Sequence, residues 1–324
     1  MFNYIVMNYS VAIRTLGKAG SKYQTLLDSL VSQTIKPCNI YVYIAEGYPL
    51  PKETVGVEKY KYVTKGMVAQ RALLYEDVDS EYILFLDDDL FLPPDTVEKM
   101  FMHLQVNNAD VVSPDVMPNH TRDLVGRIMM SLSGRMIARR FSNYWGYKVM
   151  LNSGYSYNIN PHKDTYVSQT NAGACFLCKK EDFLKIKFED ELWLDEMGYP
   201  LGEDQVMYYK MYLNGLKQVT WYTHNVVHLD AGTNQTSRDK VKNLVFSDFR
   251  FKLIFWHRFI FLPHKNLFYK FAAILAILYT LIFTLVVSVI KFDWQILEVK
   301  WSSIMNALDF MKSDAYRNLP KIKL

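Results

Sequence analysis

The chain has 324 residues, of which 50% are hydrophobic and 22% are charged, and its formal net charge is +4. This composition excludes a disordered chain, and the mild charge without a basic run argues against a nucleic-acid partner. Three cysteines are too few for a disulfide framework. The length suits one large α/β domain with an appendage.

The first part of the chain alternates between stretches typical of strands and stretches typical of helices. Strands are predicted at 9–15, 39–47, 82–86 and 110–116, and helices at 20–35, 66–78 and 95–107. Strands separated by helices favour βαβ units and a mostly parallel, Rossmann-like sheet flanked by helices. Ligands bind such sheets beyond the carboxyl ends of the strands, where Thr15, Glu46 and the run from Asp87 to Asp89 fall.

The pattern changes between 121 and 170, a stretch rich in Gly, Ser, Asn and Tyr. We interpret it as an insertion or lid on the acceptor side of a site. Regular structure returns with "TNAGACFLCKKEDFLKI", which holds a C-x-x-C pair. If that segment is a strand, Cys175 and Cys178 face opposite sides of the sheet and share no metal.

The stretch "EYILFLDDDLFLPPD" ends a buried strand with three carboxylates. In an extended chain Asp87 and Asp89 lie on one side and Asp88 on the other. Mg²⁺ or Mn²⁺ takes one or two carboxylates together with phosphate oxygens and water. Asp89 is therefore expected to hold a metal, and Asp87 to hold either the metal or a ribose hydroxyl. A helix cap does not explain the triplet, because Asp95 already begins the next helix as a capping box.

A second acidic pair, Glu203 and Asp204, follows a glycine at the start of an amphipathic helix. The pair either stabilises the helix N-terminus or supplies a general base. Other candidates also have a structural alternative. They are His228 as a metal ligand, Arg71 and Arg238 as diphosphate ligands and Trp193 as a platform for a sugar ring.

Taken in order, these segments resemble family 2 glycosyltransferases, which have the GT-A fold. The resemblance covers residues 9–240 and rests on "SVAIRT", "IYVYIAEG", "KGMVAQRALLY", "EYILFLDDDLFLPPDTVEKM", "TNAGACFLCKKEDF", "GYPLGEDQVMYYKMYLNGLK" and "VVHLDAGT". It implies an Mn²⁺ or Mg²⁺ cofactor and assigns roles by class of ligand. The nucleotide-sugar donor is assigned to Thr15, Glu46, Arg71, Asp87, Asp88 and Arg238. The metal is assigned to Asp89, Asp87 and His228, the acceptor to Glu203 and Trp193, and general-base catalysis to Asp204.

The resemblance implies a metal-dependent, inverting transfer of a sugar, from a UDP-sugar in the first instance, to a glycan or lipid-linked hydroxyl. A sugar-phosphate nucleotidyltransferase is a second interpretation, although "RTLGKAGSK" offers only a faint phosphate loop. A third is a non-catalytic membrane scaffold with a degenerate transferase domain. A homo-oligomer is compatible with each of these.

The C-terminal part contains 20 residues without a charge, 271–290, between Lys270 and Lys291. As a helix this stretch is about 30 Å long, the thickness of the hydrocarbon core, so it is predicted to cross a membrane. The alternative is a fully buried helix of a soluble protein. We divide the chain into a catalytic domain (1–240), a basic aromatic membrane-interface segment (241–270), the transmembrane helix (271–290) and an amphipathic tail (291–324). The N-terminus has no basic, apolar leader, so we expect a cytoplasmic catalytic domain on an inner membrane, with a single-pass C-terminal anchor.

Overall fold

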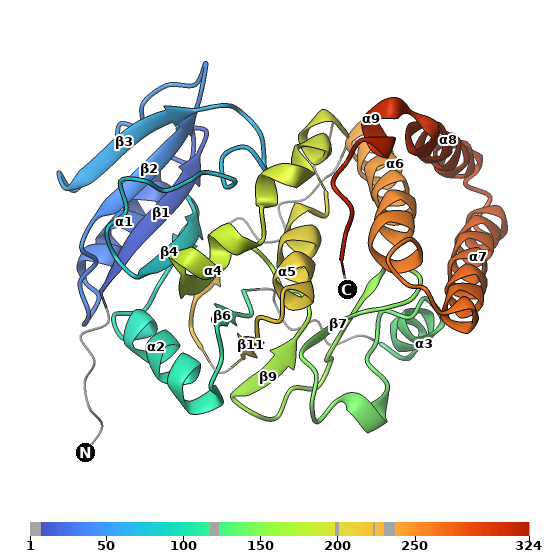
Figure 1. Cartoon of the computed structure of the whole chain (residues 1–324), viewed down its shortest axis with the longest axis horizontal. Helices are drawn as coiled ribbons and strands as arrows, with labels where there is room; N and C mark the ends of the chain where they lie inside the picture. Colours follow the sequence, from blue (N-terminus) through green and yellow to red (C-terminus); the bar gives the residue numbers. More distant parts are fainter. Residues whose placement is uncertain (1–7, 117–122, 198–200, 223, 230–236, 324) are drawn as a thin grey trace.

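The computed structural model describes residues 8–116, 123–197, 201–222, 224–229 and 237–323, and Figure 1 traces the chain. The strands are β1 (Tyr9–Thr15), β2 (Ile40–Ala45), β3 (Glu58–Val63), β4 (Tyr82–Asp87), β5 (Leu90–Phe91), β6 (Val111–Pro114), β7 (Tyr147–Val149), β8 (Tyr155–Tyr157), β9 (Thr165–Ser168), β10 (Cys175–Lys179), β11 (Gln218–Trp221) and β12 (Val227–His228). The α-helices are α1 (Ser21–Val31), α2 (Thr96–Asn107), α3 (Leu124–Leu132), α4 (Lys180–Lys185), α5 (Glu203–Leu213), α6 (Arg238–Phe255), α7 (Leu267–Ile290), α8 (Trp294–Lys312) and α9 (Asp314–Arg317). Two 3₁₀ segments, η1 (Arg139–Phe141) and η2 (Phe188–Met197), and a π-helical turn, η3 (Trp256–Phe261), complete the described elements.

The central sheet has eight strands in the order β3-β2-β1-β4-β10-β6-β11-β9. Strands β3, β2, β1 and β4 pair in parallel, as do β6 and β11. Strand β10 runs antiparallel to both β4 and β6, and β9 runs antiparallel to β11 at the edge. The expected mostly parallel sheet is confirmed, and the ends of β1, β2 and β4 meet at one edge.

Both faces of the sheet are covered, which explains the unbroken apolar run of β4. Leu84 and Leu86 pack into a core shared with α1 and α2, while Ile83 and Phe85 pack into a second core shared with α4, α5 and α6. The two cysteines of β10 divide in the same way, since Cys175 lies in the first core and Cys178 in the second. Both cysteines are free thiols on opposite faces, so they share no metal.

The prediction of a helix at 66–78 is wrong, because the chain there forms turns. The carboxylate of Asp195 accepts hydrogen bonds from the backbone amides of Val68 and Ala69, both at 2.9 Å. Backbone amides at the start of a helix are usually satisfied by a capping residue close in sequence. Here the distant Asp195 carboxylate takes that role. Tyr75, with a φ of 52°, then turns the chain out of the helical region. Strand β3 follows β2 at the sheet edge and was not predicted from its charged and tyrosine-rich sequence.

The described part of the insertion, from 123 to 170, is a small subdomain beside the sheet. It contains α3, the β7–β8 hairpin and β9, which joins the main sheet through β11. Tyr147 and Gln169 tie the hairpin to β9 through a backbone hydrogen bond of 2.9 Å. The insertion is therefore part of the folded domain, placed next to the start of α5.

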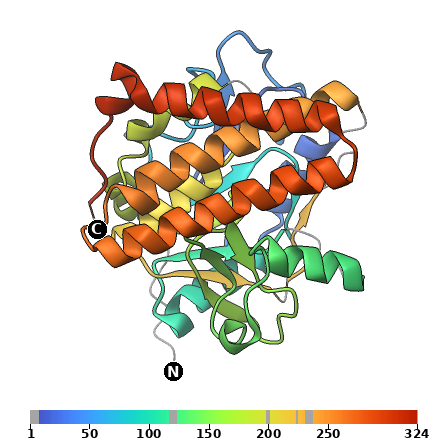
Figure 2. The same ribbon diagram turned by 90° about the vertical axis from the view of Figure 1, so that its right-hand side faces the viewer.

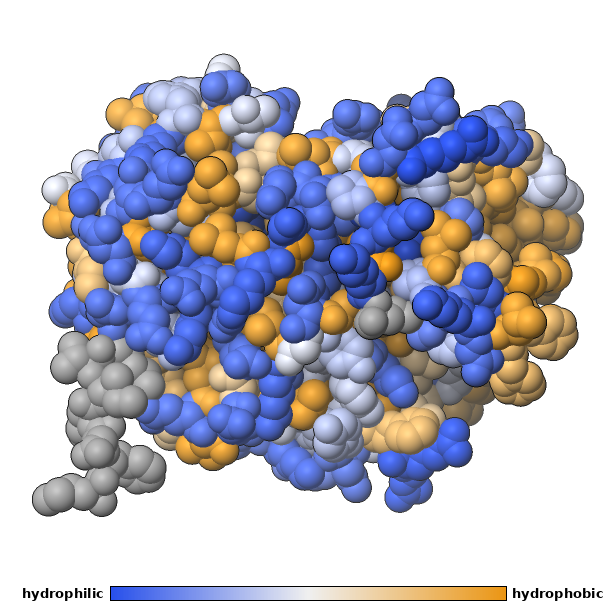
Figure 3. All heavy atoms as spheres, viewed as in Figure 1, coloured by the Kyte–Doolittle hydropathy of each residue, from blue (hydrophilic) through white to orange (hydrophobic). Residues whose placement is uncertain are grey.

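The long helices α6, α7 and α8 form a layer at one end of the molecule (Figures 1 and 2). In the described part of the chain, α7 is the helix long and apolar enough to cross a membrane. A core helix would be mostly buried, but only 22% of the most apolar stretch of α7 is. Its outer residues form the apolar right-hand margin of Figure 3.

The inner face of α7 carries polar contacts along its length. The side-chain amide of Asn152 donates to the Thr280 hydroxyl at 2.7 Å, and the Tyr279 hydroxyl donates to the Leu132 carbonyl at 2.8 Å. Near the far end the Lys300 ammonium donates to the Ser288 hydroxyl at 2.8 Å. The helix is therefore held lengthwise against the insertion and α8.

Candidate active site

Three carboxylates and two guanidinium groups meet where β1, β4 and α5 converge. Arg14 and Asp87 are direct partners in the β1–β4 register. The Arg14 Nε lies 2.5 Å from Asp87 Oδ1, and its Nη2 lies 3.6 Å from Glu203 Oε1. Arg71 donates from Nη2 to Asp87 Oδ1 at 3.2 Å and from Nη1 to Asp204 Oδ1 at 3.0 Å. The two arginines therefore join the acidic end of β4 to the acidic start of α5.

The carboxylates of this network differ in pKa. Burial alone would raise the pKa of Asp87, but the charges of Arg14 and Arg71 outweigh it and hold the pKa below its usual value. Burial, followed by repulsion from Asp204, raises the pKa of Glu203 to about 7. Asp87 is thus an ionised anchor at neutral pH, whereas Glu203 takes up a proton near neutrality.

Asp88 points away from this network toward the end of β1. Its carboxylate accepts a short hydrogen bond from the Thr15 hydroxyl, which also accepts one from the Gly17 amide at 2.8 Å. Burial raises the pKa of Asp88 to about 6, with a smaller contribution from repulsion by Asp89, although the Thr15 bond opposes the rise. Thr15 and Asp88 therefore form one polar unit at the sheet edge.

Asp89 and His228 lie together on the short β5–β12 ladder. The Asp89 Oδ1 is 3.0 Å from the His228 Nε2, and the Leu229 amide donates to the Asp89 carbonyl at 2.8 Å. Their side chains are only 12% and 22% exposed. Within the described ranges, no group of three or more His, Cys, Asp or Glu side chains could hold a metal ion. One carboxylate and one imidazole nevertheless fit a divalent cation that takes its remaining ligands from diphosphate and water.

A cavity of about 460 Å³ opens beside Asp204. One wall comes from the insertion, one from the start of α5 and one from α6. The lining comprises Arg135, Tyr147, Gly154, Tyr155, Tyr157, Thr170, Asn171, Ala172, Leu201, Gly202, Glu203, Asp204, Gln205, Asp248, Phe251 and Lys252. Asp204 is 32% exposed there, whereas the Glu203 side chain is 8% exposed. Asp204 is therefore the more accessible acid of the pair.

Two glycines permit this close approach. A Cβ on Gly173 would collide with the Asp204 carboxylate, and a Cβ on Gly202 would collide with the ring of Phe251. Gly202 also has a φ of 89°, which disfavours other residues there. The start of α5 is consequently pressed between β10 and α6, with Asp204 fixed at the cavity wall.

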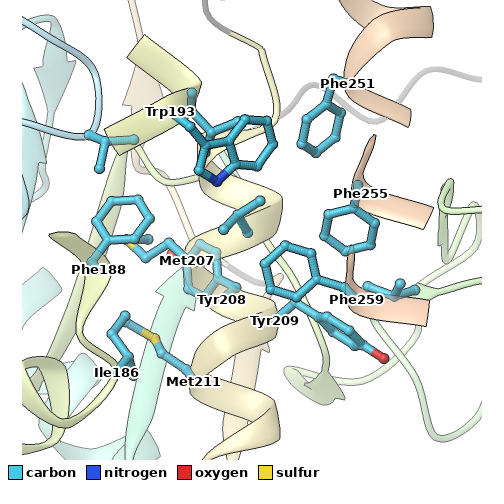
Figure 4. Close-up of a cluster of buried hydrophobic side chains, with 14 of the residues drawn as sticks. Ile186, Phe188, Trp193, Met207, Tyr208, Tyr209, Met211, Phe251, Phe255 and Phe259 are labelled. Atoms are coloured by element: carbon cyan, nitrogen blue, oxygen red, sulfur yellow. The ribbon is translucent and has the colours of Figure 1, made fainter. Parts of the chain in front are cut away.

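The remaining sequence candidates do not line this cavity. Glu46 is exposed in the turn after β2. Trp193 is 5% exposed in the second core (Figure 4). Its Nε1 donates to Glu191 at 2.7 Å. Arg238 begins α6 and pairs with Asp293 at 2.5 Å, although the loop before it lies outside the described residues. Arg71 belongs to the carboxylate network, with a side chain only 3% exposed.

Sequence reasoning did not identify Arg14, which bridges Asp87 and Glu203. The signal was present, since Arg14 is the one charged residue of β1 and the other residues of that strand are apolar or carry hydroxyl groups. An arginine in such a strand requires a partner.

Residues 59–186 match the family model described as glycosyl transferase family 2. No curated protein matches the chain. Similar solved structures include GalNAc-T7 with UDP, GalNAc and Mn²⁺, with 15% identity and a TM-score of 0.48 over 81% of this chain and 52% of that one. Another is TarS of S. aureus, with 14% identity and a TM-score of 0.48 over 85% of this chain and 43% of that one. The chain thus spans about half the length of these proteins. The chain therefore contains a region, residues 59–186, that is similar to glycosyl transferase family 2, and this region lies in a mostly parallel sheet flanked by helices.

Proposed function

We propose that this protein transfers a sugar from a nucleotide-sugar, a UDP-sugar in the first instance, to a hydroxyl group of an acceptor, with inversion at the anomeric carbon. The observation that carries the proposal is the placement of Asp204. Arg71 holds its Oδ1 at 3.0 Å, while the side chain reaches a cavity large enough for a sugar. General-base catalysis needs an oriented, accessible carboxylate close to the place where the nucleotide-sugar binds.

The donor occupies the edge formed by the ends of β1, β2 and β4. Thr15, Asp88 and the exposed Glu46 are the polar groups available to the nucleoside there. Asp87 serves this edge indirectly, since both arginines engage it. We assign Arg14 and Arg71 as positioning residues that keep Asp87 ionised and Asp204 oriented.

Asp89 and His228 would hold an Mn²⁺ or Mg²⁺ ion at the donor diphosphate, and the mixture of oxygen and nitrogen donors favours Mn²⁺. When bound, the ion would neutralise charge on the departing diphosphate. The nearby Asp88 adds negative potential that the cation would offset.

Asp204 takes the proton from the acceptor hydroxyl. The hydroxyl oxygen forms a bond to the anomeric carbon as the bond from that carbon to the diphosphate oxygen breaks on the opposite face. The nucleoside diphosphate leaves with the bonding electron pair. Glu203, held by Arg14, lines the same cavity and is proposed to bind the acceptor in its protonated form.

We also propose that α7 attaches the enzyme to the inner membrane at its cytoplasmic face, next to a lipid-linked glycan acceptor. The polar contacts along the inner face of α7 support an orientation in the plane of the bilayer. A crossing helix would carry Asn152 and the Lys300 ammonium to hydrocarbon depth, where polar and charged groups are costly. The exposed outer face, from Leu267 to Ile290, would then be the part in contact with lipid.

The proposed function is tested first by a thermal-shift screen of the detergent-solubilised chain against UDP, GDP, dTDP and CDP sugars, with and without Mn²⁺. We expect one nucleotide to stabilise the wild type only when Mn²⁺ is present. Asp89→Ala should lose this shift, and Asp204→Asn should keep it and lose product formation. The matched control is Asp79→Asn, at an exposed position outside the carboxylate network.

The absence of any shift in folded wild-type protein would favour the non-catalytic scaffold instead. Equal loss of donor binding in the Asp89 and Asp204 variants would refute the proposed division of roles.

A further inference from the structure

A second cavity, of about 340 Å³, lies between α3 and α7. Its lining is mostly apolar and comes from the insertion, α7 and α8, namely Gly126, Met129, Met130, Ser133, Arg135, Tyr157, Phe283, Thr284, Val287 and Lys300. No residue of the donor edge or of the carboxylate network belongs to it. The cavity therefore requires an explanation of its own.

The two cavities share a boundary. Arg135 and Tyr157 line both the cavity beside Asp204 and the cavity between α3 and α7. The Tyr157 amide donates to the Arg135 carbonyl at 3.0 Å, so the two residues are held together. A ligand that extends from one cavity into the other would pass this pair.

The second cavity is flanked by apolar surface. On α3, Val125 and Ile128 are 66% and 49% exposed, and on α7, Ile282 and Val286 are 60% and 46% exposed. These residues alternate along their helices with the residues that line the cavity. A lipid chain at this face would meet these apolar side chains beside the cavity.

The boundary is positively charged. Arg135 is exposed, and none of the ion pairs found within the described ranges includes it. The insertion from 123 to 170 contains six arginines and lysines against two aspartates. A guanidinium between a polar and an apolar cavity is well suited to bind a phosphate that joins a head group to a lipid chain.

We propose that the cavity between α3 and α7 binds the lipid chain of a phosphorylated lipid acceptor, with its phosphate at Arg135 and its sugar beside Asp204. This inference rests on the proposed function and adds a binding site to it. The lipid can be an isoprenyl phosphate or a glycerophospholipid, since both join a phosphate to an apolar chain.

The test measures binding of farnesyl phosphate and of dioctanoyl phosphatidic acid to the full chain in detergent, by intrinsic tryptophan fluorescence. Farnesol probes the binding of the lipid chain alone, and inorganic phosphate probes the binding of the phosphate alone. Val287→Trp fills the cavity, and Val286→Trp places the same side chain on the exposed neighbour. Since the substitutions add a tryptophan, competition with a fluorescent lipid provides the second readout.

Of farnesyl phosphate and dioctanoyl phosphatidic acid, we take the one that binds the wild type more tightly. We expect Val287→Trp to weaken its binding about tenfold or more, and Val286→Trp to leave its affinity within about twofold. Arg135→Gln should weaken the phosphorylated lipid about tenfold and leave farnesol unchanged, as expected for one lost charge-assisted contact. Met129→Trp blocks the cavity from the α3 side, should Val287→Trp fail to fold. Tighter binding of farnesyl phosphate would identify the lipid as an isoprenyl phosphate, and tighter binding of phosphatidic acid would identify it as a glycerophospholipid.

Equal affinity in Val286→Trp and Val287→Trp would overturn the site, and equal loss of farnesol and farnesyl phosphate in Arg135→Gln would overturn the phosphate assignment. Binding of UDP with Mn²⁺ is measured in the same variants. If that binding persists while lipid binding is unaffected by the substitutions, the further inference fails and the proposed function stands. If the wild type binds lipid but no nucleotide, the proposed function fails by itself.

Discussion

At the scale of single residues, the site depends on how two arginines distribute charge among three acids. Asp87 has the closer guanidinium partners and stays ionised, whereas Glu203 is buried next to another carboxylate and resists ionisation. Arg71 contacts both Asp87 and Asp204, and its Nη2 also donates to the Gly173 carbonyl at 2.9 Å. A lysine would supply the charge without the planar fork that fixes this geometry.

The raised pKa of Glu203 makes stability depend on pH. Its pKa rises from an ordinary value near 4.5 to about 7 in the folded chain, so the native state binds its proton more tightly. The folded state therefore loses stability as pH rises from 4.5 through 7, by up to about 3 kcal/mol. In Glu203→Gln, which has no proton to release, we expect a flatter profile in urea unfolding between pH 4.5 and 7.5.

Glu181→Gln, on the exposed surface of α4, is the control and should keep the wild-type slope. An unchanged slope in Glu203→Gln would mean that Glu203 is ionised throughout this range, with Arg14 as its compensating charge.

At the scale of elements, the C-terminal helices are joined to the catalytic domain through a buried ion cluster. Glu191 of η2 is fully buried, and Arg258 of η3 contacts both its oxygens, at 2.8 and 3.0 Å. The Lys210 ammonium of α5 approaches the same carboxylate at 3.1 Å. This cluster connects α5, which carries Asp204, to η3, the turn that precedes α7.

Removal of the Arg258 guanidinium should destabilise the fold, because the buried Glu191 carboxylate would lose its main partner. We expect Arg258→Met to lower the free energy of unfolding by about 3 to 5 kcal/mol, because Glu191 loses its bidentate partner in the core. The double variant Arg258→Met with Glu191→Gln should regain part of that loss. Chemical denaturation monitored by circular dichroism measures both changes, and a neutral effect of Arg258→Met would show that Lys210 alone suffices.

At the scale of the whole molecule, the position of α7 decides how the protein would lie in the proposed membrane attachment. Its inner face packs on the insertion and α8, while Leu267 at one end and Phe292 just beyond the other are 81% and 78% exposed. In the proposed in-plane orientation both ends lie on the same side of the bilayer. In a single-pass orientation they lie on opposite sides.

Labelling of single cysteines distinguishes the two orientations. Leu267→Cys and Phe292→Cys are introduced into a Cys38→Ser background, because Cys38 is exposed and the other cysteines are buried. With a membrane-impermeant maleimide added to sealed inside-out vesicles, we expect both sites to react. Reaction of only one site until the vesicles are opened would establish a crossing helix and overturn the in-plane proposal.

The sequence alone determined β1, β2, β4, β6, α1 and α2, the mostly parallel character of the sheet and the identity of the acidic groups, because these follow from local hydrophobic periodicity and from residue chemistry. It correctly predicted β4 from its apolar run and the start of α5 at Glu203. Only the tertiary structure decided which acids pair with which arginine, since Arg14 lies 73 positions from Asp87, and Arg71 lies 133 positions from Asp204. The turns at 66–78 were also decided there, because the carboxylate that caps them belongs to the distant Asp195. Likewise, 20 uncharged residues specify an apolar helix, but the partners of its inner face come from segments that sequence periodicity does not bring together.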